Sequence, residues 1–191
     1  MTGDTPPGLV NVANVLTVLR IVLVPVFVAC LFAGGTGWRL AALVVFCVAS
    51  VTDFADGQVA RSRGLVTDFG KIADPVADKA LTGSALICLS GLGELPWWVT
   101  AVIMFRELGV TALRFWVIRR GVIAASRGGK AKTLLQVIAI CLYVLPGPLR
   151  PPGLVLGLVM AAAVAVTLVT GADYVLQAMR LRRSEPGTGA A

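Results

Sequence analysis

Six long apolar runs, separated by short polar or turn-forming breaks, make up most of this 191-residue chain. They cover residues 12–33, 39–60, 72–92, 96–118, 132–149 and 153–175. Each run has about the 20 residues that an α-helix needs to cross the hydrocarbon core of a bilayer. Gly and Pro clusters, which mark turns, follow the first, third and fifth runs. The pattern therefore predicts an all-α, polytopic membrane protein with six transmembrane helices.

The composition agrees with this assignment. The chain is 57% hydrophobic and only 14% charged, whereas about a quarter of the residues of a soluble domain are charged. We expect a short N-terminal segment at 1–11, one membrane domain at 12–178 and a basic, disordered tail at 179–191. Because no Lys or Arg precedes the first apolar run, no cleaved signal peptide is expected.

The basic residues predict how the helices are oriented. Arg and Lys gather in the second and fourth connections, around 61–71 and 119–132, and in the tail, whereas the odd-numbered connections hold only Arg39 and Arg150. The positive-inside rule then places both termini and both basic connections on the cytoplasmic side of a bacterial membrane. A cytoplasmic collar facing anionic lipid headgroups accounts for the net charge of +7, so no nucleic-acid partner is expected.

Half of the acidic residues, five of ten, lie between positions 53 and 78. Four of them belong to two helical faces, in which the spacing of three or four residues places side chains on one side of a helix. These faces consist of Asp53, Asp56, Gly57 and Ala60 in the second run and of Gly70, Asp74 and Asp78 in the third. Antiparallel packing of the two runs would bring the four carboxylates together near the cytoplasmic boundary. Without counter-charge they would repel one another and take up protons.

Divalent cations resolve this repulsion. The chain has no histidine, which excludes His-based zinc sites and Ser-His-Asp triads. Aspartate clusters without thiolate suit Mg²⁺ or Mn²⁺, and four carboxylates balance two such ions. A two-metal site can stabilise the attacking and leaving oxygens of a phosphoryl displacement, and Arg61 could hold a phosphate with two hydrogen bonds. Asp68 lies off both faces and is interpreted as a solvated or helix-capping residue.

Three other interpretations of the acids were weighed. In the first, Lys79 or Arg61 neutralises them and they only hold helices together. In the second, they line the cation path of a transporter, although such a path needs no Gly57, Ala60 and Arg61 at set offsets, and the halves show no inverted repeat. In the third, the protein is an inactive scaffold, which would be expected to have lost at least one acid.

The order of these residues resembles the signature of the CDP-alcohol phosphatidyltransferases. It reads Asp53-x2-Asp56-Gly57-x2-Ala60-Arg61-x8-Gly70-x3-Asp74-x3-Asp78. The resemblance implies the six-helix fold of that family, a homodimer, and transfer of a phosphatidyl group from a CDP-linked lipid to an alcohol with release of CMP. It implies that Asp53, Asp56 and Asp74 bind metal and that Asp78 both contacts metal and deprotonates the acceptor. The implied CDP-lipid site comprises Asp56, Gly57, Ala60, Arg61, Gly70 and Asp74.

Basic residues in the fourth and fifth runs bear on the acceptor. A buried Glu107 is expected to pair with an arginine and hold it in place. An anionic acceptor would use a phosphate-binding cluster, for which the candidates are Arg106, Arg114, Lys130 and Lys132. The alternative is that these cations only follow the positive-inside rule, an explanation we prefer for Arg119, Arg120 and Arg127.

Four further segments resemble the phosphatidylglycerophosphate synthase branch of the family. They are the first-run element with Asn14, Leu16, Thr17 and Arg20, the GKIADPVADK segment with Lys71, and the FRE and GKAKTLLQ segments with Thr133. The branch implies CDP-diacylglycerol as donor and sn-glycerol 3-phosphate as acceptor. Phosphatidylglycerol, which would give cardiolipin, and inositol phosphate remain alternative acceptors.

Overall fold

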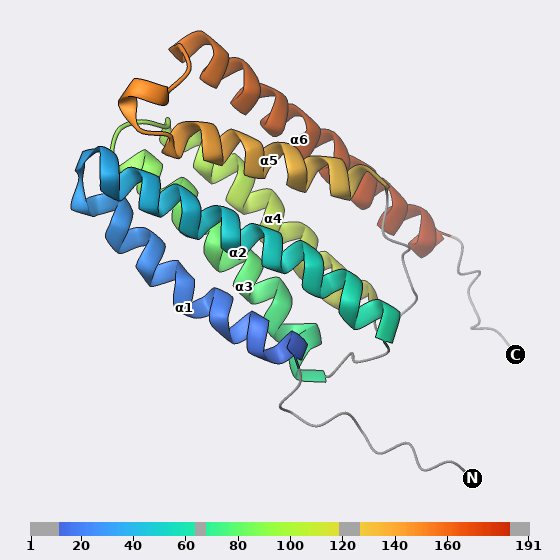
Figure 1. The fold of residues 1–191 in the computed structure, drawn as a ribbon. Helices are drawn as coiled ribbons and strands as arrows, with labels where there is room; N and C mark the ends of the chain where they lie inside the picture. The colour runs from blue at the N-terminus through green and yellow to red at the C-terminus, as the bar shows by residue number, and fades with distance from the viewer. Residues whose placement is uncertain (1–11, 64–67, 119–126, 184–191) are drawn as a thin grey trace, which may run out of the picture. The chain divides into compact units, whose positions relative to one another are not determined.

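The computed structural model describes residues 12–63, 68–118 and 127–183 (Figure 1). At several helix ends, 12–14, 53–63, 68–74, 114–118, 127–130, 178 and 180–183, only the backbone is described. The described part of the chain consists of helices joined by short turns and contains no strand. Its elements are α1 (Val12–Ala33), α2 (Gly35–Arg63), α3 (Asp68–Gly91), α4 (Trp97–Ile118), α5 (Arg127–Val144), the short 3-10 helix η1 (Gly147–Leu149) and α6 (Gly153–Arg183). The predicted all-α class is confirmed.

The six helices correspond to the six apolar runs, and the differences occur at their ends. Only Gly34 separates α1 from α2, because Gly34 and Gly35 adopt φ angles of 75° and 80°, a left-handed conformation that glycine reaches without steric clash. The predicted end of the fifth run at residue 149 is wrong. Helix α5 stops at Val144, since the prolines at 146 and 148 cannot donate backbone hydrogen bonds. Helix α6 extends to Arg183, so residues 179–183 of the predicted tail are helical.

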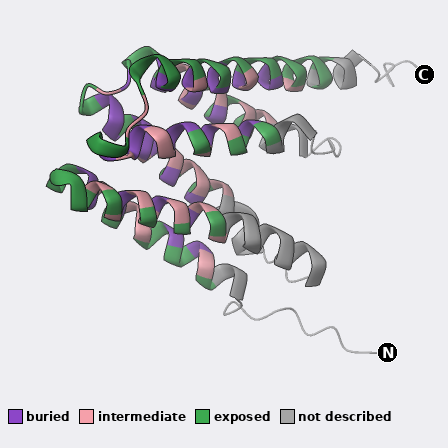
Figure 2. Ribbon diagram, turned by 45° about the horizontal axis from the view of Figure 1, so that its top comes forward, coloured by how far each residue is buried: buried purple, intermediate pink, exposed green. Residues whose placement is uncertain are grey.

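The surface of the helices is that of a membrane protein. Three segments are long and apolar enough to cross a bilayer, namely Val15–Ala33, Gly35–Thr52 and Gly153–Gln177. Large apolar side chains are widely exposed, among them Phe105 at 83% and Leu154 at 75%, and Figure 2 shows exposed positions along α6. A soluble monomer rarely exposes so much apolar surface, whereas lipid solvates it. Exposed tryptophans in the first turns of α2 and α4 are typical of the membrane interface.

The chain forms two compact units. Unit 1 comprises Met1–Pro96 and Ile140–Pro151, and therefore holds α1, α2, α3, the end of α5 and η1. Within it α1 packs against both α2 and α3. The rings of Phe27 and Phe46 lie 5.5 Å apart in the core, and alanines such as Ala42 and Ala85 are fully buried. Small residues at these contacts let the helix backbones approach closely.

Unit 2 comprises Trp97–Ala139 and Pro152–Ala191, and holds α4, most of α5 and α6. Helices α4 and α6 pack against each other, with Ile103 and Met160 among the buried side chains. Polar residues are buried here too, including Glu107, Lys132 and Thr170. Buried charge in an apolar unit has to be paired, so these residues are candidates for function.

Arg39, Glu94 and Arg150 form an ion cluster in unit 1. Arg39 of α2 makes a two-pronged ion pair with Glu94, in which its Nη2 lies 2.7 Å from Oε2, and it also donates to the Tyr143 and Val144 carbonyls at 3.1 and 3.3 Å. Arg150 approaches the same Glu94 oxygen at 2.9 Å and lies over the Tyr143 ring. Glu94 thus connects α2, the α3–α4 turn and the segment after α5. In the sequence, Arg39 and Arg150 served only to predict how the helices are oriented in the membrane.

Replacing Glu94 by glutamine is expected to lower the free energy of unfolding by about 1–3 kcal/mol, because two partly buried arginines lose their counter-charge. Burial alone would raise the pKa of Glu94, but the hydrogen bonds and charge of Arg39, with the charge of Arg150, outweigh it and hold this pKa below the usual 4.5. The stabilisation is therefore present above about pH 4.5 and is lost as pH falls through the lower, folded-state pKa.

Thermal unfolding in detergent, followed by tryptophan fluorescence, measures this difference. The difference in melting temperature between wild type and Glu94→Gln should be largest at pH 7 and should shrink below about pH 4.5. Asp173→Asn is the matched control, since it makes the same chemical change at an exposed acid of α6. Equal stability of Glu94→Gln and wild type at pH 7 would contradict a stabilising role of the cluster.

Candidate functional site

The eight residues of the predicted signature, here called the aspartate motif, lie on two consecutive helices of unit 1. The motif residues of the second run all fall within the C-terminal part of α2, and those of the third run within the N-terminal half of α3. Only residues 64–67 join the two helices, which limits the distance between the helix ends to about 18 Å. Because α2 and α3 also contact each other, the backbone brings both halves of the motif to one end of the unit.

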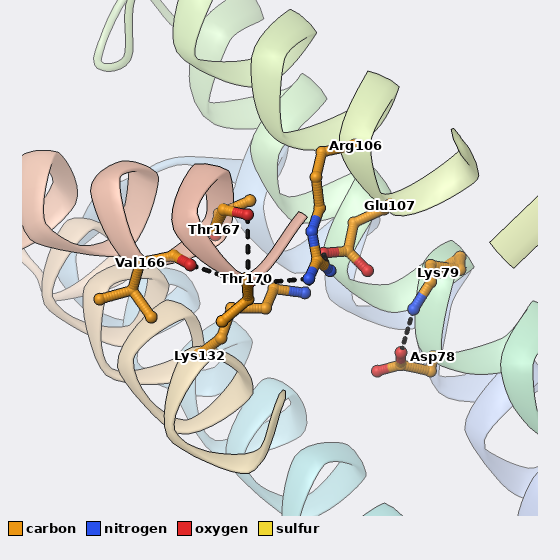
Figure 3. A network of polar contacts seen from close by, with 8 residues as sticks. All are labelled: Asp78, Lys79, Arg106, Glu107, Lys132, Val166, Thr167 and Thr170. Carbon is orange, nitrogen blue, oxygen red and sulfur yellow. Dashed lines mark hydrogen bonds and ion pairs between the residues drawn. The ribbon is translucent and has the colours of Figure 1, made fainter. Parts of the chain in front are cut away.

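Seven motif side chains lie outside the described residues, so their predicted convergence on metal remains a prediction. They are Asp53, Asp56, Gly57, Ala60, Arg61, Gly70 and Asp74. The eighth, Asp78, is described. Its Oδ2 accepts a hydrogen bond from Lys79 Nζ at 2.8 Å (Figure 3), and its side chain is 33% exposed. The remaining carboxylate oxygen of Asp78 has no protein partner in the described part of the chain and can accept a proton or a ligand.

The N-terminal half of α1 contributes two buried polar residues to unit 1. Thr17 and Arg20 are each 1% exposed and, three residues apart, lie on one face of the helix. Since α1 packs against both motif helices and runs antiparallel to α2, this face belongs to the same end of the unit as the aspartate motif. Asn14 and Lys71 have no described side chains.

Arg20 is not among the predicted site residues, yet a fully buried guanidinium requires polar or charged partners. The signal in the sequence was a single arginine within an otherwise apolar run, which marks function in a membrane helix. Complete burial distinguishes Arg20 from an arginine that extends to the lipid surface.

A second polar site, here called the Glu107 cluster, lies in unit 2 and consists of Arg106, Glu107, Lys132 and Thr170. Glu107 Oε1 accepts from Lys132 Nζ of α5 and, at 3.2 Å, from Arg106 Nη1. The side chains of Glu107 and Lys132 are both 6% exposed, and that of Arg106 is 10% exposed. The expected pairing of Glu107 with an arginine is present, and the bond to Lys132 was not foreseen. Among the described residues, one carboxylate thus contacts two buried cations.

The structure therefore brings together two of the four predicted acceptor residues, Arg106 and Lys132. Arg114 and Lys130 lie on α4 and α5, but their side chains are outside the described residues. Thr133 is exposed at the start of α5. A buried pair of cations is suited to bind an anion, and a planar guanidinium is well matched to phosphate oxygens.

These features define a helical membrane protein with an aspartate motif on consecutive helices and a separate buried cation cluster. Residues 10–169 match the CDP-alcohol phosphatidyltransferase family, and the chain belongs to this family. The match covers all the motif residues and ends within α6, at residue 169.

Among curated proteins, the chain is similar to several bacterial enzymes. It is 56% identical to a probable phosphatidylglycerophosphate synthase of Mycobacterium tuberculosis, over 89% of this chain and 82% of the relative. It is 38% identical to the CDP-diacylglycerol–glycerol-3-phosphate 3-phosphatidyltransferase of Bacillus subtilis, over 86% and 93% of the two chains. The Escherichia coli K12 protein of the same name is 39% identical over 68% and 74%.

Proposed function

We propose that this chain transfers the phosphatidyl group of CDP-diacylglycerol to sn-glycerol 3-phosphate, which yields phosphatidylglycerophosphate and CMP. The main support is its similarity, over most of both chains, to relatives whose names state this reaction. The Glu107 cluster supports the choice of acceptor, because two buried cations meet there and a phosphorylated alcohol carries the anionic group that such cations bind.

The aspartate motif suits a pair of divalent cations. Its donors are carboxylates without histidine or thiolate, the set that Mg²⁺ and Mn²⁺ prefer, and the backbone carries both halves to one end of unit 1. We assign Asp53, Asp56, Asp74 and Asp78 as the residues that would hold two such ions. When bound, the ions would supply charge stabilisation for the phosphates of the donor and for the departing CMP.

The remaining chemistry is assigned to side chains of the chain itself. Asp78 takes the proton from the attacking hydroxyl of the acceptor through the oxygen that Lys79 leaves unoccupied. Arg61 holds donor phosphates, while Gly57, Ala60 and Gly70 leave room for the CDP moiety. Arg106 holds the phosphate of glycerol 3-phosphate, and Glu107 fixes both Arg106 and Lys132.

All six helices are proposed to cross the membrane, with both termini and the aspartate motif on the cytoplasmic side. This orientation rests on the basic second and fourth connections. Three of the helices meet the length and apolarity of a spanning segment over their described residues. The other three helices, α3, α4 and α5, carry charged residues of the two proposed sites, and these charges lower their mean hydropathy. A homodimer is the oligomeric state we propose, from the family resemblance.

The acceptor can be tested with purified protein in detergent. CDP-diacylglycerol and Mg²⁺ are supplied with radiolabelled glycerol 3-phosphate, phosphatidylglycerol or inositol phosphate in parallel, and labelled lipid and released CMP are both measured. We expect a lipid product and an equal amount of CMP with glycerol 3-phosphate alone, since this is the acceptor that the names of the relatives state. Product from only one of the other two acceptors would contradict the assignment, and no CMP with any acceptor would contradict the enzyme activity.

A further inference from the structure

Helix α6 provides the contact surface for Arg106. The Arg106 side chain leaves α4 and donates from Nη2 to Thr170 Oγ1 at 2.8 Å, as Figure 3 shows. Thr170 is itself buried, at 6% exposure. A hydrogen bond from a charged donor to a buried hydroxyl fixes the end of a long side chain that would otherwise sample several rotamers.

The orientation of the Thr170 hydroxyl is also defined. Its Oγ1 lies 2.8 Å from the Val166 carbonyl and 3.2 Å from the Thr167 carbonyl, one turn earlier in α6. A hydroxyl has one proton, and donation of that proton to the helix backbone leaves its lone pairs as acceptors. The hydroxyl therefore presents a fixed acceptor to Arg106.

The next residue, Gly171, leaves the space that the stem of Arg106 occupies. A Cβ atom at this position would lie 3.0 Å from Arg106 Cγ and 3.3 Å from its Nε, closer than ordinary van der Waals contact. Gly157, on the same helix, has nothing within 4 Å of such a Cβ atom. The Arg106 stem thus requires glycine at position 171, whereas position 157 has room for a side chain.

These contacts leave Arg106 able to bind an anion. A guanidinium has five N–H donors, and the described residues accept from two of them, through Glu107 at 3.2 Å and Thr170 at 2.8 Å. Both terminal nitrogens therefore keep a further hydrogen. Held on two sides and with its side chain only 10% exposed, the group is preorganised for a phosphate.

We propose that Thr170 and Gly171 are positioning residues for the acceptor: they hold Arg106 in the orientation in which it binds the phosphate of glycerol 3-phosphate. This inference rests on the proposed acceptor role of Arg106. It assigns to α6, which carries none of the motif residues, a part in substrate selection.

The test uses the full-length enzyme with saturating CDP-diacylglycerol and varied glycerol 3-phosphate. Thr170→Val keeps the shape and removes the hydroxyl, and Gly171→Ala displaces the arginine stem. Each should raise the KM for glycerol 3-phosphate about five- to tenfold. The KM for CDP-diacylglycerol and the melting temperature should stay close to wild type. Thr170→Ser, which restores the hydroxyl, should stay within about twofold of wild type.

Two matched controls on α6 make the same chemical changes without touching Arg106. Gly157→Ala adds a methyl group in open space, and Thr167→Val removes a buried hydroxyl that has no hydrogen-bond partner in the described part of the chain. Both should leave the acceptor KM unchanged. Should Thr170→Val fail to fold, Gly171→Ala and Thr170→Ser still carry the comparison.

Arg106→Gln separates the two levels of the hypothesis. It should raise the acceptor KM about ten- to a hundredfold, through loss of charge-assisted bonds. If it does, while Thr170→Val and Gly171→Ala leave that KM at the wild-type value or only lower stability, the positioning role is wrong and the proposed acceptor site stands. If Arg106→Gln leaves the acceptor KM unchanged, both are wrong.

Discussion

Asp78→Asn is expected to reduce phosphatidyl transfer by about 10²–10⁴-fold while the protein stays folded. The substitution keeps the size of the side chain but replaces the basic carboxylate by a neutral amide that cannot take the proton of the acceptor hydroxyl, and general-base catalysis contributes about this factor. It also breaks the ion pair with Lys79, but that pair is partly exposed, so little stability is lost. The measurement is CMP release under saturating concentrations of both substrates, together with the melting temperature.

Asp68→Asn is the matched control for this substitution. Asp68 is the first residue of α3 and is not a motif residue, and asparagine caps a helix about as well as aspartate does. Activity within about twofold of wild type is therefore expected. Normal turnover in folded Asp78→Asn would exclude Asp78 as the base, and an equal loss in Asp68→Asn would show that the effect is not specific to the motif.

Removal of divalent cations is expected to abolish turnover and leave the helices intact. With the ions chelated, the four motif carboxylates would repel one another and the donor phosphates would lose their counter-charge. Mg²⁺ or Mn²⁺ should restore activity, because oxygen ligands favour these hard cations. Full CMP release in the presence of excess EDTA would contradict a metal-dependent mechanism, and unchanged circular dichroism would show that only the site was affected.

The helical layout could be predicted from the sequence because it depends on local properties. Runs of apolar residues define the helices, and the end of the first helix at Ala33 was predicted correctly, since the glycines after it adopt a tight turn. The end of α5 was misplaced because apolarity alone extends the fifth run to Leu149, across the Pro-Gly-Pro turn signal at 146–148. The helix ends there because proline has no backbone N–H to donate a helical hydrogen bond.

Contacts between distant residues could not be predicted in the same way. The arginines at 39 and 150 looked like isolated charges, yet both bind Glu94 in the folded chain. Pairing of Glu107 with an arginine could be predicted, because Arg106 lies next to it in an apolar run. Its bond to Lys132, 25 residues away, depends on the packing of α4 and α5. The roles of Thr170 and Gly171 also become visible only through the side chain of Arg106.

The chemistry of the aspartate motif was accessible from residue type and spacing alone. The spacing of three or four residues places the carboxylates on two helix faces. Because the motif offers oxygen ligands and the chain has no histidine, it favours hard cations. The backbone agrees with this arrangement in bringing the end of α2 and the start of α3 to one end of unit 1. The convergence of the seven side chains is the central claim that an experiment has to decide.

Binding of Mn²⁺ to the purified protein tests that claim most directly. Free Mn²⁺ is followed by electron paramagnetic resonance during titration, with CDP-diacylglycerol present and no acceptor, for wild type and for Asp56→Asn, Asp74→Asn and Asp68→Asn. Our account predicts two bound Mn²⁺ ions per wild-type chain, the same for Asp68→Asn, and loss of binding in the two motif variants. Absence of bound Mn²⁺ in wild type, or full binding in both motif variants, would contradict it.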